Sequence, residues 1–318
     1  MVRYYELAGL LVVIGLPMAQ ASGGIPRTPW GVPDINGVWK FSIATPLQRD
    51  DSLGDKTHFT TDEAAAYLAN SISRNTDLAA EFDGGKDKFV GLELWQPYDE
   101  APLTRDLRTF LVYDPVDGKI PYTPAGEQRL AKVSRHHFEP PAGPEDRPLA
   151  DRCILGFNTG PPMDLTFEYN DYAQIFVTQN TVVIMTEMVN DARIVPLNGQ
   201  AHLPENIRHY RGDSRGNWEG DTLVVKTQNF TDESAYMGSG RNMRVTERFT
   251  LISDGTLEYD FRVEDPENFK TPWAARTEMR KSDEPIYEYA CHEHNRSMEY
   301  MLMGARVQEA TKRGDQEE

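Results

Sequence analysis

The sequence predicts a mainly antiparallel β protein in which eight or nine strands form a barrel or a barrel-like sheet. From about residue 172 onward, short runs rich in β-branched and aromatic residues follow one another, and turn signals separate them. The connections are too short for the crossovers that parallel strands need. The runs are Ala173–Thr178, Thr181–Met188, Ala192–Leu197, Ile207–Arg211, Thr222–Gln228, Arg244–Ser253, Thr256–Glu264, Trp273–Arg280 and Ile286–Cys291.

Side-chain alternation within these runs indicates a sheet with one buried face. Leu257, Tyr259, Phe261 and Val263 alternate with charged residues, and Asp254-Gly255 before them is a two-residue hairpin signal. We interpret residues 212–221 as a longer hairpin loop. A barrel of eight or nine strands has room inside for side chains or for one small ligand.

Three further parts are expected around the barrel, which we assign to residues 165–294. Residues 1–21 read as a signal peptide, because a short charged start, an apolar run and Ala19-Gln20-Ala21 follow one another. Residues 22–164 should form an arm and helices that wrap the core, and residues 295–318 a terminal helix and a polar tail. The whole of 22–318 is expected to be one structural unit.

Several short elements are expected outside the main strand run. Thr60 to Glu63 is a capping box that starts a helix, and Pro124 opens another helix that ends near Arg135. The terminal helix spans Ser297–Lys312. Its apolar residues recur at helical spacing, and we expect them to pack against the sheet. They are Met298, Met301, Leu302 and Ala305. Ile35–Phe41 and Leu111–Tyr113 read as short strands.

Composition points to an exported protein that binds neither nucleic acid nor membranes. The formal net charge is −17, which repels nucleic acid and anionic lipid. After the signal peptide no apolar stretch is long enough to span a bilayer. We therefore expect a periplasmic or secreted protein.

The two cysteines, Cys153 and Cys291, are expected to form a disulfide, because an exported chain with an even pair most simply bridges them. Two alternatives remain open at Cys291-His292-Glu293-His294. His292 and His294 could bind zinc or copper, with His202 or His209 as a third ligand. Cys291 could be a nucleophile. We predict no cofactor, and we keep zinc or copper as an open possibility.

Acid–base chemistry is the catalytic hypothesis that the titratable residues favour. Glu247 shares the apolar strand face of Val245 and Phe249, and a carboxyl group on the inner face of a barrel has a raised pKa. The structural alternative is an internal Glu–Arg pair that ties strands together. The candidate catalytic residues are His292, Glu288, Glu247, Asp191, Arg193 and His202. In a strand, His292 and Glu288 would share one face, opposite Cys291.

Two resemblances complete the sequence evidence. Gly37-Val38-Trp39 resembles the G-x-W of lipocalins. Four longer motifs are similar to those of a large family of secreted bacterial proteins that carries no assigned reaction. They are PWGVPDINGVW at 29–39, DARIVPL at 191–197, GDSRGNWEGDTLVV at 212–225 and YEYACHE at 287–293. This resemblance implies one continuous fold and brings no mechanism. Members of the family often have Gly at the position of His294.

These observations lead to one main functional hypothesis and two alternatives. The main hypothesis is an exported enzyme that transfers protons as a lyase, isomerase or hydrolase, acting on a small, partly apolar molecule inside the barrel. The first alternative is a periplasmic, lipocalin-like binding protein without catalysis. The second is a surface or scaffold protein.

Overall fold

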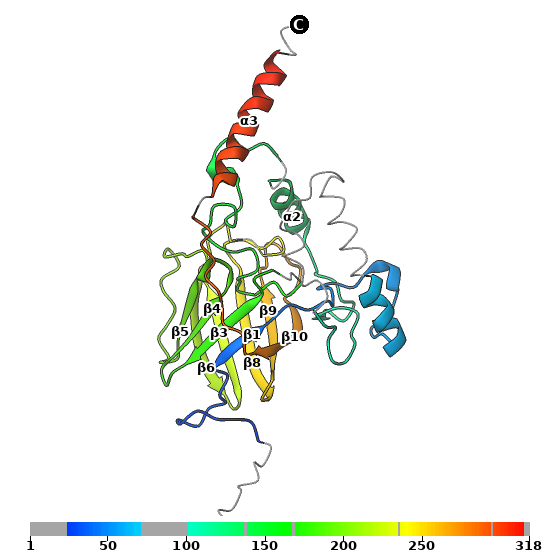
Figure 1. The fold of residues 1–318 in the computed structure, drawn as a ribbon, viewed down its shortest axis with the longest axis vertical. Coiled ribbons are helices and arrows are strands. Elements are labelled where there is room, and N and C mark those ends of the chain that lie inside the picture. The colour runs from blue at the N-terminus through cyan, green and yellow to red at the C-terminus, as the bar shows by residue number, and fades with distance from the viewer. Residues whose placement is uncertain are drawn as a thin grey trace, which may run out of the picture.

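Ten antiparallel strands form one barrel-like sheet in a computed structural model, which describes residues 24–70, 101–136, 139–166, 169–234, 236–293 and 295–314 (Figure 1). The strand order is β5-β4-β3-β1-β10-β9-β8-β7-β6, and β2 also pairs with β10. The strands are β1 (Gly37–Lys40), β2 (Val112–Asp114), β3 (Tyr172–Val177), β4 (Thr181–Thr186), β5 (Ala192–Pro196), β6 (Asp213–Glu219), β7 (Thr222–Gln228), β8 (Arg244–Ser253), β9 (Thr256–Glu264) and β10 (Trp273–Ser282). The predicted signal peptide and His294 lie outside the described residues.

β1 lies in the middle of the sheet, although it comes from the segment expected to wrap the core. Trp39 pairs with Ala173 of β3 on one side and with Lys281 of β10 on the other. Its side chain is fully buried, and its indole N–H donates to the Ile35 carbonyl at 3.0 Å. The N-terminal arm therefore joins two runs of sequential strands, β3–β5 and β6–β10, into one sheet.

The sheet is not closed, because the two end strands meet without a hydrogen-bonded ladder among the described residues. They nevertheless approach each other through side chains. A Cβ added at Gly216 of β6 would lie 2.8 Å from the Val195 and Leu197 side chains. Glycine at this position lets β5 side chains cross the backbone of β6.

Inward-facing side chains fill the barrel with one buried apolar cluster. Alternate residues of β8 and β9 are buried, as the sequence alternation predicts, and both strands contribute to the same core as β4 and β7. Phe249, Tyr259 and Phe261 form tilted ring contacts at 5.0–5.5 Å within it. Dense packing of this kind makes the barrel interior rigid.

Seven of the nine predicted runs correspond to strands, and two predictions are wrong. Ile207–Arg211 is not a strand, because its backbone turns and the Gly212 amide donates to the His209 carbonyl. Ile286–Cys291 is an irregular segment that leads to a turn. Conversely, the predicted loop at 212–221 contains β6, and the actual turn is limited to Gly220-Asp221, where Gly220 has φ +61°. Its polar sequence suits an edge strand, which is only half buried.

Helices lie outside the sheet. The α-helices are residues 61–70, α2 (Pro124–His136) and α3 (Arg296–Gly314), and short 3-10 helices occur at η1 (Asp51–Leu53), η3 (Pro144–Asp146) and η4 (Met188–Asn190). The capping box is confirmed: the Thr60 amide donates to Glu63 at 2.9 Å, and the Glu63 amide donates to the Thr60 hydroxyl at 3.3 Å. Within the described ranges, no helix combines the length and the apolar content needed to cross a bilayer.

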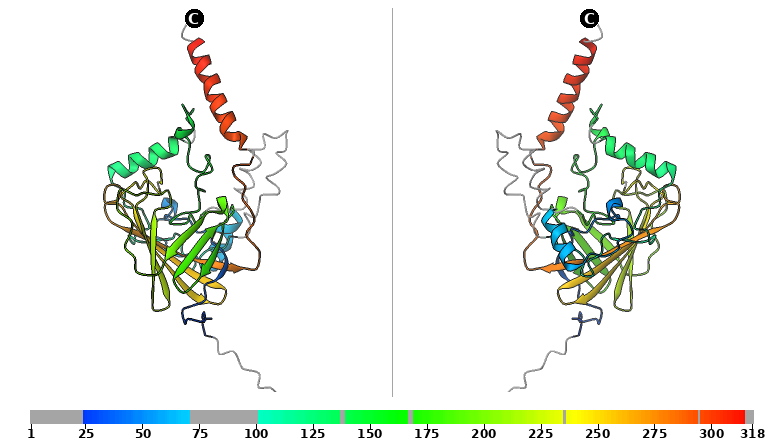
Figure 2. Two further views of the ribbon diagram at one scale, coloured as in Figure 1. Left: turned by 90° about the vertical axis from the view of Figure 1, so that its left-hand side faces the viewer. Right: turned by 90° about the vertical axis from the view of Figure 1, so that its right-hand side faces the viewer.

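The expectation that the terminal helix packs against the sheet is wrong, because α3 projects away from the barrel (Figures 1 and 2). The preceding segment is tied to the 139–153 region by the predicted disulfide between Cys153 and Cys291, which is present. The Asn295 side chain also donates to the Asp151 carbonyl at 2.9 Å. Because these links hold the residues just before Arg296, α3 begins beyond the end of the barrel.

Candidate functional site

A buried polar cluster inside the barrel contains two of the predicted catalytic residues. Arg193 of β5 and Glu247 of β8 form a bidentate ion pair, with Arg193 Nη2 3.0 Å from Glu247 Oε1. The Tyr259 hydroxyl of β9 donates to the same carboxylate oxygen at 2.9 Å and accepts from the Met163 amide at 3.1 Å. Glu247 and Tyr259 have no exposed surface, and Arg193 is only 5% exposed.

A second ion pair extends this cluster towards Asp191. Arg211 Nη1 lies 3.0 Å from Asp191 Oδ2, and Arg211 Nη2 donates to the Thr159 carbonyl at 3.1 Å. Burial lowers the pKa of Arg211, and the charge of Arg193 adds to this, although Asp191 opposes both. Burial also disfavours the Arg193 cation, but Glu247 outweighs it and raises the pKa of Arg193. Both guanidinium groups stay charged at physiological pH.

The cluster connects separate strands of the barrel. It joins β5, β8 and β9 with the 159–163 segment, and Arg193 and Glu247 line none of three cavities of about 820, 370 and 140 Å³ in the described part of the chain. Both Glu247 oxygens accept hydrogen bonds, Oε1 from Arg193 and Tyr259 and Oε2 from Arg193, which is the arrangement expected of an internal structural pair. This geometry favours the structural reading of Glu247.

His202 lies in a separate place. Its Nδ1 is 2.9 Å from Asp213 Oδ2, and Arg215 contacts the other oxygen at 2.5 Å. Burial by itself raises the pKa of Asp213, but hydrogen bonds from the Leu203 amide, His202 and Arg215 outweigh it and hold that pKa below its ordinary value. These contacts anchor the 198–212 connection to the first residue of β6.

His292 and Glu288 are exposed and lie in the irregular segment before α3. Because this segment is not a strand, the expected division of its side chains between two faces does not apply. Neither residue joins the barrel cluster or His202. Among the described residues, no group of three or more His, Cys, Asp or Glu side chains is placed to hold a metal ion, and His294 is outside them.

The largest of the three cavities is a cleft of about 820 Å³, which we call the α2 cleft. It lies between α2, the 145–162 segment and the 230–236 loop. Apolar and aromatic side chains form much of its wall; they are Val133, Leu149, Leu155, Phe157, Tyr210, Phe230 and Tyr236. Five acidic and two basic residues also line it, so the cleft is net acidic. Its volume lies in the usual range for small-molecule sites.

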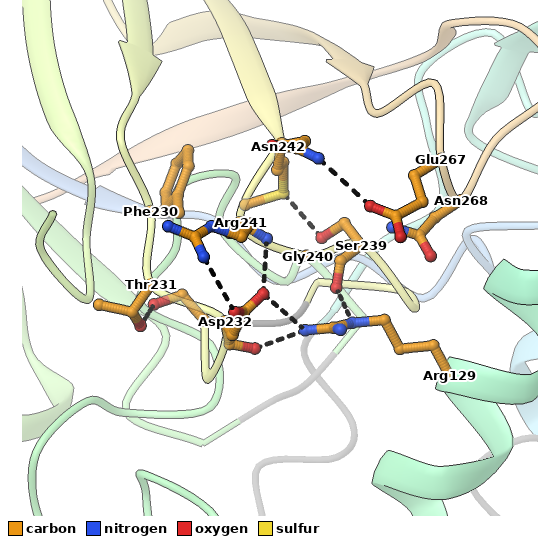
Figure 3. Close-up of polar contacts among 12 residues, drawn as sticks. Arg129, Phe230, Thr231, Asp232, Ser239, Gly240, Arg241, Asn242, Glu267 and Asn268 are labelled. Carbon is orange, nitrogen blue, oxygen red and sulfur yellow. Dashed lines mark hydrogen bonds and ion pairs between the residues drawn. The ribbon is translucent and has the colours of Figure 1, made fainter. Parts of the chain in front are cut away.

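Contacts from α2 hold the loop beside this cleft in place (Figure 3). Arg129 donates to the Ser239 carbonyl at 2.7 Å and to the Asp232 carbonyl at 2.5 Å. The Gly240 amide donates to the buried Asp265 at 2.8 Å. The helix itself docks closely, because a Cβ at Gly126 would lie only 2.1 Å from the Asn268 carbonyl oxygen. The cleft wall is therefore preformed.

Two smaller cavities lie nearby. One of about 140 Å³ shares Ala150, Gly156 and Phe157 with the α2 cleft and reaches Tyr289 and the disulfide at Cys291. Tyr289 and Cys291 of the YEYACHE segment line this small cavity and so lie beside the α2 cleft, whereas His292 does not line it. The other, of about 370 Å³, lies beside Arg241 and Asn242, and most of the residues that line it are polar or charged.

The sequence singled out Arg193 and Glu247 as separate candidates and allowed an internal Glu–Arg pair at Glu247, but it did not name Arg193 as the partner, and it missed Tyr259, Arg211 and the cleft. Tyr259 is on the inner face of β9 in the sequence pattern, so a search for a buried hydroxyl near Glu247 would have found it. Arg211 was assigned to a strand that does not exist. Phe157 and Arg129 carry no local signal, because their roles depend on how distant loops and α2 meet.

Comparison with known proteins does not assign a family. No family model matches the chain, and no curated protein matches it. Among solved structures, the chain is similar to a secretary abundant heat soluble (SAHS) protein from Ramazzottius varieornatus. The identity is 15%, the match covers 35% of this chain and 70% of that chain, and the TM-score is 0.24.

Proposed function

We propose that this chain is an exported small-molecule-binding protein whose ligand is a partly apolar molecule held in the α2 cleft. The observation that carries the proposal is the cleft itself, which has a volume of about 820 Å³ and an aromatic wall. The disulfide is consistent with export, because such bonds persist in oxidising compartments.

The charge of the cleft indicates what kind of ligand it accepts. Asp151 is paired with Arg147 at 2.7 Å, and Glu233 is paired with Arg152 at 2.7 Å, so these carboxylates are already neutralised locally. Asp232 is also paired, with Arg129 and Arg241 at 3.8 and 3.9 Å. Outside these ion pairs, Glu145 and Asp146 face Lys132 in the lining, so it still disfavours an anionic ligand. A neutral or cationic aromatic molecule suits it better.

The acid–base enzyme stays a prediction. Its named side chains lie in the barrel cluster, beside Asp213 and in the exposed segment before α3, and none of them lines the α2 cleft. Ligand binding in the α2 cleft therefore needs none of these acid–base side chains, whereas catalysis there would need them.

A fluorescence titration with the neutral apolar probe N-phenyl-1-naphthylamine tests the proposal. Phe157 is 48% exposed in the cleft wall, so Phe157→Ala should remove about 1 kcal/mol of contact and weaken binding about fivefold. Phe176→Ala is the matched control, because Phe176 is 43% exposed on β3 and does not line the cleft. Absence of saturable binding, or equal losses in both variants, would refute the proposal.

A further inference from the structure

The cavity of about 370 Å³ is separate from the α2 cleft, because the two share no lining residue. It lies where four neighbouring strands begin or end: Gln228 closes β7, Arg244 opens β8, Glu264 closes β9 and Pro272 precedes β10. Since neighbouring antiparallel strands run in opposite directions, these residues lie at the same end of the sheet. We call this space the rim cavity.

Three basic side chains of the rim cavity have no ion pair among the described residues. They are Arg208, Arg244 and Lys270. Arg208 Nη1 donates to the carbonyls of Phe230 and Arg241 at 3.0 and 2.7 Å, which fixes the guanidinium group but leaves it without a counter-charge. In a chain with a net charge of −17, such a group of cations is a local feature that can recognise carboxylates.

The same cavity also contains acidic side chains that are not paired. Glu205 and Glu264 line it, and neither has an ion pair in the described ranges. Glu264 is the cross-strand neighbour of Arg244 in the β8–β9 ladder, so both kinds of charge stand side by side at the rim. A ligand in this space therefore meets cations and carboxylates together.

Hydrogen bonds hold the walls of the rim cavity in place. Asp265, the third acidic residue of the lining, is only 2% exposed and accepts from the Gly240 amide and the Asn268 side chain, each at 2.8 Å. The Lys270 amide donates to the Pro121 carbonyl at 2.8 Å. Because these donors occupy the Asp265 carboxylate, it ties the loops together, and Glu205 and Glu264 are the carboxylates left for a ligand.

We propose that the rim cavity is a second binding site for a small zwitterion with two carboxylates, namely an acidic amino acid, either free or in a short peptide. A simple anion would meet Glu205 and Glu264, and a simple cation would meet the three basic residues, so each would face like charges. One ammonium group and two carboxylates match both sets. The volume of about 370 Å³ lies at the lower end of the range for small-molecule sites. This inference does not depend on the ligand proposed for the α2 cleft.

Isothermal titration calorimetry of the full chain in low-salt buffer at about pH 7 tests the site. L-Glutamate should bind saturably, and glutarate should bind about tenfold more weakly, because it has both carboxylates but no ammonium group. Glycyl-L-glutamate, titrated in parallel, distinguishes a peptide ligand from a free amino acid. The proposal is overturned if neither L-glutamate nor the peptide binds saturably, or if glutarate binds as tightly as they do.

Substitutions in the lining connect this binding to the rim cavity. Lys270→Met should weaken binding of L-glutamate or of the peptide about tenfold, because a carboxylate loses its partner. Lys226→Met is the matched control, since Lys226 is also exposed but lies on β7 outside the lining, and the affinity should not change. Equal losses in the two variants would show that general charge attraction, and not this cavity, holds the probe.

The acidic side chains are tested by the double variant Glu205→Gln with Glu264→Gln. It should remove most of the preference for L-glutamate over glutarate, because the ammonium group loses its counter-charges. A preference that the double variant leaves unchanged would contradict the zwitterion. Circular dichroism of each variant confirms that these substitutions leave the fold intact.

Discussion

At the residue scale, Glu247 shows how a buried charge becomes part of the fold. It receives hydrogen bonds from Arg193 and Tyr259, and together these residues connect three strands of the barrel. Burial, followed by the charge of Glu247, raises the pKa of Tyr259 well above its ordinary value, so its hydroxyl stays protonated and continues to donate. Such a cluster contributes mainly when it is complete, since a single unmatched charge is costly.

Removing one partner of this pair should therefore cost more than removing both. Glu247→Gln should lower the free energy of unfolding by about 3–5 kcal/mol, because it leaves the Arg193 cation buried without a counter-charge. The double variant Arg193→Met with Glu247→Met should lose less unfolding free energy than Glu247→Gln, because it leaves no unpaired charge in the core. Urea unfolding followed by tryptophan fluorescence measures both. If both variants lost the same unfolding free energy, the unpaired Arg193 charge would not be the cause of the loss.

At the scale of elements, the turn after β4 joins the barrel to the segment that precedes α3. Glu187 is buried there and accepts from the Tyr287 amide at 3.3 Å. Asn190 in the same turn donates to the Tyr287 carbonyl at 3.0 Å. Burial raises the pKa of Glu187, while the hydrogen bond from Tyr287 only partly opposes this. Folding therefore disfavours the carboxylate form of Glu187 relative to the unfolded chain.

This shift has a defined sign in pH. A raised pKa contributes stability that is present below the ordinary value of Glu and is lost as pH rises through the folded-state pKa. Glu187→Gln keeps a neutral side chain, so it should stabilise the protein at about pH 7 relative to wild type and lose this advantage near pH 4. Urea unfolding at the two pH values gives the difference. A variant that is less stable only at the higher pH would contradict the assignment.

At the scale of the whole molecule, the disulfide joins parts of the chain that are 138 residues apart. It holds the exposed 285–293 segment beside the 150–157 loop, where both contribute to the small cavity next to the α2 cleft. That segment has no strand pairing, and besides the covalent bond the contacts of Glu187, Asn190 and Asn295 hold it in place.

Replacing Cys153 and Cys291 together by alanine should lower stability by up to about 5 kcal/mol, the loop-closure value for so long a loop. Thermal and urea unfolding measure the loss, and wild-type protein treated with a reductant should behave in the same way. The near-ultraviolet signal of the barrel aromatics should persist in the folded variant. A loss of unfolding free energy below about 1 kcal/mol would mean that the noncovalent contacts hold the segment without the disulfide.

The sequence predicts the local elements well and the long-range ones poorly. Alternation in β8 and β9, the Thr60 capping box and the cysteine pair are each determined by neighbouring residues or by simple counting, and the structure confirms them. β6 was missed because edge strands tolerate polar residues, and its pairing with β7 overrides its loop-like composition. The Ile286–Cys291 run has strand propensity but no neighbouring strand to pair with.

By itself, the sequence determined the fold class, the seven strands whose apolar alternation matches a half-buried sheet, the disulfide partners and the place of Glu247 on the apolar face of its strand. Only the tertiary structure decided that β1 enters the middle of the sheet, that the barrel interior is filled, and that the cleft lies under α2. The reason is physical: periodicity records which face of an element is buried, whereas a cleft forms where distant loops such as 145–162 and 230–236 meet.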